Sequence, residues 1–110
     1  MSGESRKHRV LAVDDEQIVL SLVRDALEDE HIEVSTASKA SEAVTLMQSG
    51  DYDLLITDIR MPGMNGIELA NTARAQNPDI GIIFMTGFAN LDSAKDAIKQ
   101  GAFDYIMKPF

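Results

Sequence analysis

Short apolar runs alternate along this chain with segments of helical periodicity, and this alternation constrains the fold more than any other feature. Residues 10–13, 54–57 and 82–85 form continuous runs rich in β-branched or large apolar side chains. Such runs are typical of strands buried on both faces of a parallel sheet. Residues 31–36 alternate apolar with polar side chains, as an edge strand does, and residues 105–107 form a fifth short run.

The segments between these runs are expected to be helices. The first helix has an apolar stripe at helical spacing, formed by Val19, Leu22, Val23, Ala26 and Leu27. A second helix is expected to begin after Ser38 and to end at Gly50. A third is expected to open at Asn65 and end before Pro78, and a fourth to cover residues 91–100. This succession of strands and helices predicts an α/β domain with a parallel sheet and right-handed crossovers.

Length and composition restrict the class of protein further. Residues 1–8 are expected to form a solvated tail, and residues 9–110 fit one domain. No apolar run approaches the roughly 20 residues that a membrane helix needs, and the amino terminus lacks the apolar core of a signal peptide. The chain has no cysteine and a net charge of -8. We therefore expect a cytoplasmic domain that binds neither membranes nor, by itself, nucleic acid.

Polar residues follow the expected strands at their carboxyl ends. Asp14 and Asp15 follow the first run, Asp58 follows the third, Thr86 follows the fourth and Lys108 follows the last. Ligands of α/β sheets bind at this edge. Clustered carboxylates repel one another, and a hard divalent cation relieves the repulsion, commonly Mg²⁺ where phosphate is handled. One carboxylate then stays available as a nucleophile, while the lysine and the hydroxyl stabilise charge on a transferred phosphoryl group.

Four segments resemble the receiver domains of two-component response regulators. They are VDDE at 13–16, TDIRMPGMNG at 57–66, MTG at 85–87 and GAFDYIMKPF at 101–110, and they stand in the family's order. The resemblance implies a flavodoxin-like, doubly wound sheet of five parallel strands in the order 2-1-3-4-5. It also implies that the family's fifth helix is missing from this chain, so that the receiver domain over 9–110 is truncated.

The resemblance assigns roles to the residues at the strand ends. Asp58 matches the phosphoacceptor of the family. Asp14 and Asp15 match the acidic pair that holds Mg²⁺, together with Asp58 itself and the backbone carbonyl of Arg60. Lys108 matches the lysine that pairs with the acceptor and then with the phosphoryl oxygens.

The resemblance also implies a phosphorelay switch with protein partners. A sensor histidine kinase donates the phosphoryl group, and the receiver catalyses only its own phosphorylation and dephosphorylation, so it is not an enzyme in the ordinary sense. Thr86 and Tyr105 match the switch residues that move on activation and change the surface around the fourth helix and fifth strand. That surface controls an output domain or partner outside this chain. Residues 86–89 and 101–105 resemble receivers of σ54-dependent activators, and a homodimer is left open.

Three alternative functions make different demands on the sequence. A haloacid-dehalogenase-like phosphatase has the motif Asp-x-Asp at its nucleophile. In this chain the residue two positions after Asp58 is Arg60. A flavin or nucleotide binder needs backbone amides around the phosphate, whereas Asp14, Asp15 and Glu16 would repel it. A phosphorylation-independent, receiver-like interaction module normally lacks one of the acidic, threonine or lysine positions, and this chain has them all. That module is the alternative we keep.

Overall fold

The computed structural model describes residues 7–59, 66–86 and 104–107, and the side chains of 7–59 and 66–85. The predicted helix over residues 91–100, together with Arg60 and Lys108, lies outside these ranges. The elements run in the order β1 (His8–Val13), α1 (Gln17–Leu27), β2 (Ile32–Ala37), α2 (Ala40–Ser49), β3 (Leu54–Asp58), α3 (Gly66–Gln76), β4 (Gly81–Thr86) and β5 (Asp104–Met107).

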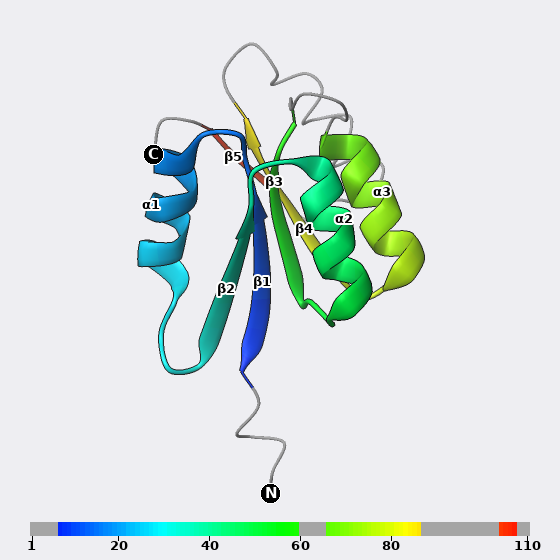
Figure 1. Ribbon diagram of the computed structural model, residues 1–110, viewed down its shortest axis with the longest axis horizontal. Helices are drawn as coiled ribbons and strands as arrows, with labels where there is room; N and C mark the ends of the chain where they lie inside the picture. Colours follow the sequence, from blue (N-terminus) through cyan, green and yellow to red (C-terminus); the bar gives the residue numbers. More distant parts are fainter. Residues whose placement is uncertain (1–6, 60–65, 87–103, 108–110) are drawn as a thin grey trace, which may run out of the picture.

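The strands form one sheet in the order β2-β1-β3-β4-β5, and each neighbouring pair is parallel. The chain moves from β1 outward to β2 and then returns past β1 to β3, so the strand order reverses between β1 and β3 (Figure 1). The α/β class and the parallel sheet predicted from the sequence are confirmed. The point of reversal, at the carboxyl ends of β1 and β3, is where such sheets bind ligands.

Helices cover both faces of the sheet. In Figure 1, α1 lies on one side of the sheet, and α2 and α3 lie together on the other. Successive strand residues point to opposite faces, so Val10 and Ala12 of β1 join the apolar cluster under α1. Leu11 and Val13 join the larger cluster under α2 and α3. Burial of β1 on both faces explains the continuous apolar run in its sequence.

The buried face of α1 differs from the predicted stripe. Val19 and Val23 are buried as expected, but Leu20 is buried in place of Leu22. Leu22 is 48% exposed, and Ile18 is 70% exposed. The helix is therefore rotated relative to the most regular apolar stripe, because the cluster formed with β1, β2 and β3 decides which side faces the sheet.

The ends of the elements agree with the sequence to within one or two residues. β1 begins at His8, one residue before the predicted domain start, and α3 ends before Asn77 as predicted. Helix α2 ends before Gly50 as predicted, but its N-cap is Lys39 and not Ser38. The backbone N–H and the hydroxyl of Ser38 both donate to Oε1 of Glu42, at 2.8 and 3.4 Å. Ser38 thus contacts the first turn of α2 from the residue that precedes the N-cap.

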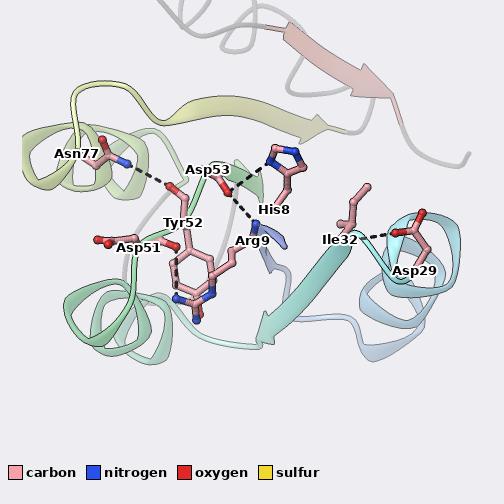
Figure 2. A network of polar contacts seen from close by, with 8 residues as sticks. All are labelled: His8, Arg9, Asp29, Ile32, Asp51, Tyr52, Asp53 and Asn77. Carbon is pink, nitrogen blue, oxygen red and sulfur yellow. Dashed lines mark hydrogen bonds and ion pairs between the residues drawn. The ribbon is translucent and has the colours of Figure 1, made fainter. Parts of the chain in front are cut away.

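A polar network links neighbouring segments at the amino ends of the strands, opposite the carboxyl ends where ligands bind (Figure 2). The Arg9 backbone N–H donates to Asp53 Oδ2 at 2.8 Å. The Arg9 guanidinium lies over the Tyr52 ring at 4.6 Å from its centroid. Asn77 Nδ2 donates to the Tyr52 carbonyl at 3.1 Å. These contacts connect β1, the segment before β3 and the end of α3.

None of the helices that the structure describes has the length and apolarity needed to cross a membrane.

Candidate functional site

The register of β1 and β3 brings two of the predicted site residues next to each other. Val13 on β1 is paired with Thr57 on β3, so Asp14 and Asp58 are the next residues along two adjacent strands. Neighbouring strands lie about 4.8 Å apart. The prediction that these two residues share one edge of the sheet is therefore confirmed.

The register continues across the sheet toward the remaining predicted residues. Asp58 is paired with Met85 on β4, which places the backbone of Thr86 one position beyond the end of β3. Thr86 is paired in turn with Met107, the last residue of β5. Tyr105 is paired with Phe84 within the sheet. Lys108, directly after β5, and Arg60 lie outside the described residues, and their predicted roles stay predictions.

Two of the acidic side chains at this edge are buried and two are exposed. Asp14 is 0% exposed and Asp58 is 8% exposed, whereas Asp15 and Glu16 reach solvent. Oδ1 of Asp14 accepts a hydrogen bond from the Glu16 backbone N–H at 2.9 Å, which turns the chain as it leaves β1. Burying a carboxylate is costly unless hydrogen bonds or a cation compensate for lost water.

Asp14, Asp15 and Glu16 offer oxygen atoms that lie within 4.8 Å of one another. Asp58 does not belong to this group among the residues that the structure describes. Oxygen donors of this kind suit a hard divalent cation, and Mg²⁺ needs only one or two direct carboxylates. The donor set at the end of β1 therefore fits the predicted cation, with Glu16 as an additional acidic neighbour to which the sequence had assigned no role.

The backbone around Asp58 is held by two contacts that the sequence did not reveal. Thr57 Oγ1 donates to the carbonyl oxygen of Asp58 at 2.9 Å. The Gly66 N–H donates to the carbonyl oxygen of Ile59 at 2.6 Å, which closes the connection from β3 into α3. The available signal for Thr57 was one hydroxyl in an otherwise apolar run, and for Gly66 its place in the 57–66 motif.

Comparison with known proteins agrees with this arrangement. The family model "Response regulator receiver domain" matches residues 10–110. The alginate biosynthesis transcriptional regulatory protein AlgB of Pseudomonas putida is 39% identical over 108 residues, which are 98% of this chain and 24% of AlgB. The DNA-binding transcriptional regulator NtrC of Salmonella typhimurium is 37% identical over 101 residues, which are 92% of this chain and 22% of NtrC. The chain thus spans about a quarter of these relatives.

Solved structures show the same fold. A response regulator receiver domain protein from Clostridium thermocellum superposes with a TM-score of 0.85 at 33% identity, covering 94% of this chain and 83% of that one. A response regulator from Burkholderia pseudomallei, solved with a phosphorylated aspartic acid, a calcium ion and citrate, gives a TM-score of 0.83 at 26% identity, covering 94% and 61%. The match over residues 10–110, the relatives and the shared fold lead to one conclusion: the chain belongs to the response regulator receiver domains of two-component systems.

Proposed function

We propose that this chain is a phosphoacceptor receiver in which Asp58 accepts a phosphoryl group from the phosphohistidine of a sensor histidine kinase. The observation that carries the proposal is the buried Asp58 at the end of β3, which lies in register beside Asp14 on the adjacent strand. Asp14 in turn belongs to the acidic group at the end of β1. A related response regulator was solved with a phosphorylated aspartic acid and a divalent cation, which supports the same chemistry here.

The residues proposed to hold Mg²⁺ are Asp14, Asp15, Asp58 and the backbone carbonyl of Arg60. When bound, the cation offsets the negative charge that collects between these carboxylates and the phosphoryl oxygens. Asp14 is placed by the end of β1 and held by its hydrogen bond from Glu16.

The reaction itself needs one nucleophile and charge stabilisation. An Asp58 carboxylate oxygen forms the new bond to phosphorus while the phosphorus–nitrogen bond to the donor imidazole breaks, and that imidazole keeps the bonding electrons and takes a proton. Lys108 and the Thr86 hydroxyl stabilise the phosphoryl oxygens. Water later hydrolyses the acyl phosphate, so the chain acts only on itself.

The proposed output follows from the relatives. AlgB and NtrC are named as transcriptional regulators, so we propose that phosphorylation changes the surface around the fourth helix and β5, with Thr86 and Tyr105 as switch residues. This surface then controls an output domain or partner of a cytoplasmic regulator, as a monomer or a homodimer.

Incubation with Mg²⁺ and acetyl phosphate tests the proposal. We expect the intact protein to gain the mass of one phosphoryl group, and Asp58→Asn to gain none. Asp51→Asn is the matched control, because Asp51 is an exposed aspartate at the opposite edge of the sheet. A folded chain that gains no mass would instead support the phosphorylation-independent interaction module.

A further inference from the structure

Thr57 places a buried hydroxyl directly beside the proposed acceptor. Its side chain is 0% exposed and lies in a strand whose other residues before Asp58 are apolar. A buried hydroxyl costs free energy unless it makes a hydrogen bond. Here the Oγ1 donates to the carbonyl oxygen of Asp58 at 2.9 Å. The hydrogen bond of Thr57 therefore goes to the backbone of the residue on which the chemistry is proposed to occur.

The first residue of α3 packs against the same peptide group. A Cβ atom on Gly66 would overlap the carbonyl oxygen of Asp58 and would lie 2.9 Å from its carbonyl carbon and 3.1 Å from Cα of Ile59. All three atoms belong to the backbone, which cannot move aside as the end of a flexible side chain can. The peptide between Asp58 and Ile59 is thus enclosed by the Thr57 hydroxyl and the Gly66 backbone.

We infer that Thr57 is a positioning residue for phosphorylation of Asp58. This inference rests on the proposed function. The direction of the Asp58 carbonyl defines the backbone torsion at which the chain leaves β3. Holding that torsion restrains the backbone of Asp58, which carries the acceptor carboxylate beside Asp14 on the adjacent strand.

Positioning of this kind affects rate more than stability. Phosphoryl transfer depends mainly on in-line placement of the nucleophile, and small misplacements cost large factors in rate. Replacing the hydroxyl by a methyl group keeps the volume and shape of Thr57 but removes the hydrogen bond to the Asp58 carbonyl. A hydroxyl that only filled the core would leave the phosphorylation rate unchanged after this replacement.

The test compares Thr57→Val and Thr57→Ser with wild type in the full chain. Phosphorylation by acetyl phosphate is followed by intact mass over a range of acetyl phosphate concentrations at saturating Mg²⁺, and thermal unfolding is followed by circular dichroism. We expect Thr57→Val to lower the maximal rate about tenfold, with the half-saturating acetyl phosphate concentration little changed. Thr57→Ser keeps the hydroxyl and should restore the rate to within about twofold of wild type.

Ile56→Val separates positioning from stability. Ile56 precedes Thr57 in the strand and is buried on the opposite face of the sheet. Its truncation weakens the core without touching the Asp58 carbonyl, so its maximal rate should equal that of wild type. If Thr57→Val fails to fold, Thr57→Ala carries the same expectation.

Three results would decide against the inference. Wild-type rates in Thr57→Val would overturn it, and so would equal slowing in Ile56→Val. A folded wild-type chain that gains no phosphoryl group would overturn the proposed function first, and this inference with it. In the first case the proposed function would stand, because wild type is still phosphorylated at Asp58, and only the role of Thr57 would be removed.

Discussion

Burial divides the acidic side chains at the end of β1 between two tasks. Asp14 is fully buried and shapes the turn through its hydrogen bond from Glu16, whereas Asp15 and Glu16 are exposed. An exposed carboxylate can be neutralised with little effect on the core. Cation binding and folding should therefore be separable at Asp15 and Glu16, and inseparable at Asp14.

Asp15→Asn should weaken Mg²⁺ binding and leave the fold intact. We expect the Mg²⁺ concentration for half-maximal phosphorylation to rise about tenfold or more, with an unchanged unfolding temperature. Glu16→Gln should raise it by a smaller factor, because Glu16 supplies an additional charge in the same group. Glu33→Gln, at an exposed acidic residue on β2, is the control. Equal Mg²⁺ dependence in Asp15→Asn and wild type would exclude Asp15 from the metal site.

Gly66→Ala should destabilise the chain because its Cβ would overlap the Asp58 backbone. Overpacking of this kind costs about 1–3 kcal/mol. Gly50→Ala is the matched control, since its Cβ would meet only the end of the flexible Arg9 side chain and should cost less. Urea denaturation measures both, and equal midpoints for the two variants would contradict the close contact at Gly66.

The sequence located the residues at the carboxyl ends of β1, β3 and β4 but not the contacts around them. Asp14, Asp58 and Thr86 could be predicted because parallel strands end at a common edge. Thr57 and Glu16 could not, because their roles depend on backbone turns that follow β3 and β1. A hydrogen bond from a hydroxyl to the next carbonyl leaves no pattern in the sequence.

At the scale of elements, the end of α1 covers part of the edge strand β2. β2 is an edge strand, and such strands offer open backbone groups to other chains. Glu28 Oε2 accepts from the Val34 N–H at 3.3 Å, and Arg24 Nη2 donates to the Val34 carbonyl at 3.3 Å. The two side chains also pair with each other at 3.9 Å. Both backbone groups of Val34 are thus hydrogen-bonded, one by α1 and the other by its C-cap residue Glu28.

Removing this protection should favour association between chains. We expect the double variant Arg24→Ala with Glu28→Ala to self-associate at lower concentration than wild type, with a stability loss of about 1 kcal/mol or less for the exposed pair. Asp25→Ala with Lys39→Ala removes the same charges elsewhere on the exposed surface and should behave as wild type. Light scattering over a concentration series measures this, and identical behaviour of the two double variants would refute a protective role.

The order of the elements could be predicted from the sequence more readily than the rotation of each helix about its own axis. Continuous apolar runs predicted buried strands because β1 and β3 contact helices on both faces. Leu22 was wrongly expected on the buried face of α1. Several apolar stripes fit one helix, and only packing against the sheet selects between them. The N-cap at Lys39 differs for a similar reason, because Ser38 binds Glu42 instead of capping the helix itself.

At the scale of the whole molecule, the two edges of the sheet have separate roles. The carboxyl edge gathers the acidic residues of the proposed site. The amino edge joins β1 to the segments around β3 and α3 through Arg9, Tyr52, Asp53 and Asn77 (Figure 2). Stability contributed at the amino edge should therefore be independent of chemistry at the other edge.

Arg9→Ala should lower stability without affecting phosphorylation. The variant loses the cation–π contact with Tyr52 and the Nη1 hydrogen bond to the Asp51 carbonyl, so we expect a loss of about 1 kcal/mol. Lys7→Ala, at an exposed neighbouring cation, should cost less. Urea denaturation and the acetyl phosphate assay are run on the same samples. A slower phosphorylation of folded Arg9→Ala would show that the two edges are coupled.

The sequence predicted the sheet and the gathering of polar residues at the carboxyl ends of its strands. It did not predict the polar network at the amino ends of the strands. Hydrophobic runs and crossover rules determine which ends of parallel strands lie together. The contact between Arg9 and Tyr52 joins residues more than 40 positions apart and depends on the register of β1 and β3. Such pairs become visible only once that register is known.

The central claim is that the side chain of Asp58 carries the phosphoryl group, and locating that group within the chain tests it most directly. The protein is treated with Mg²⁺ and acetyl phosphate, digested under mildly acidic conditions, and its peptides are sequenced by tandem mass spectrometry. We predict that the added mass lies on Asp58 alone. A phosphoryl group found on Asp14, Asp15 or Asp53, with Asp58 unmodified, would contradict the account.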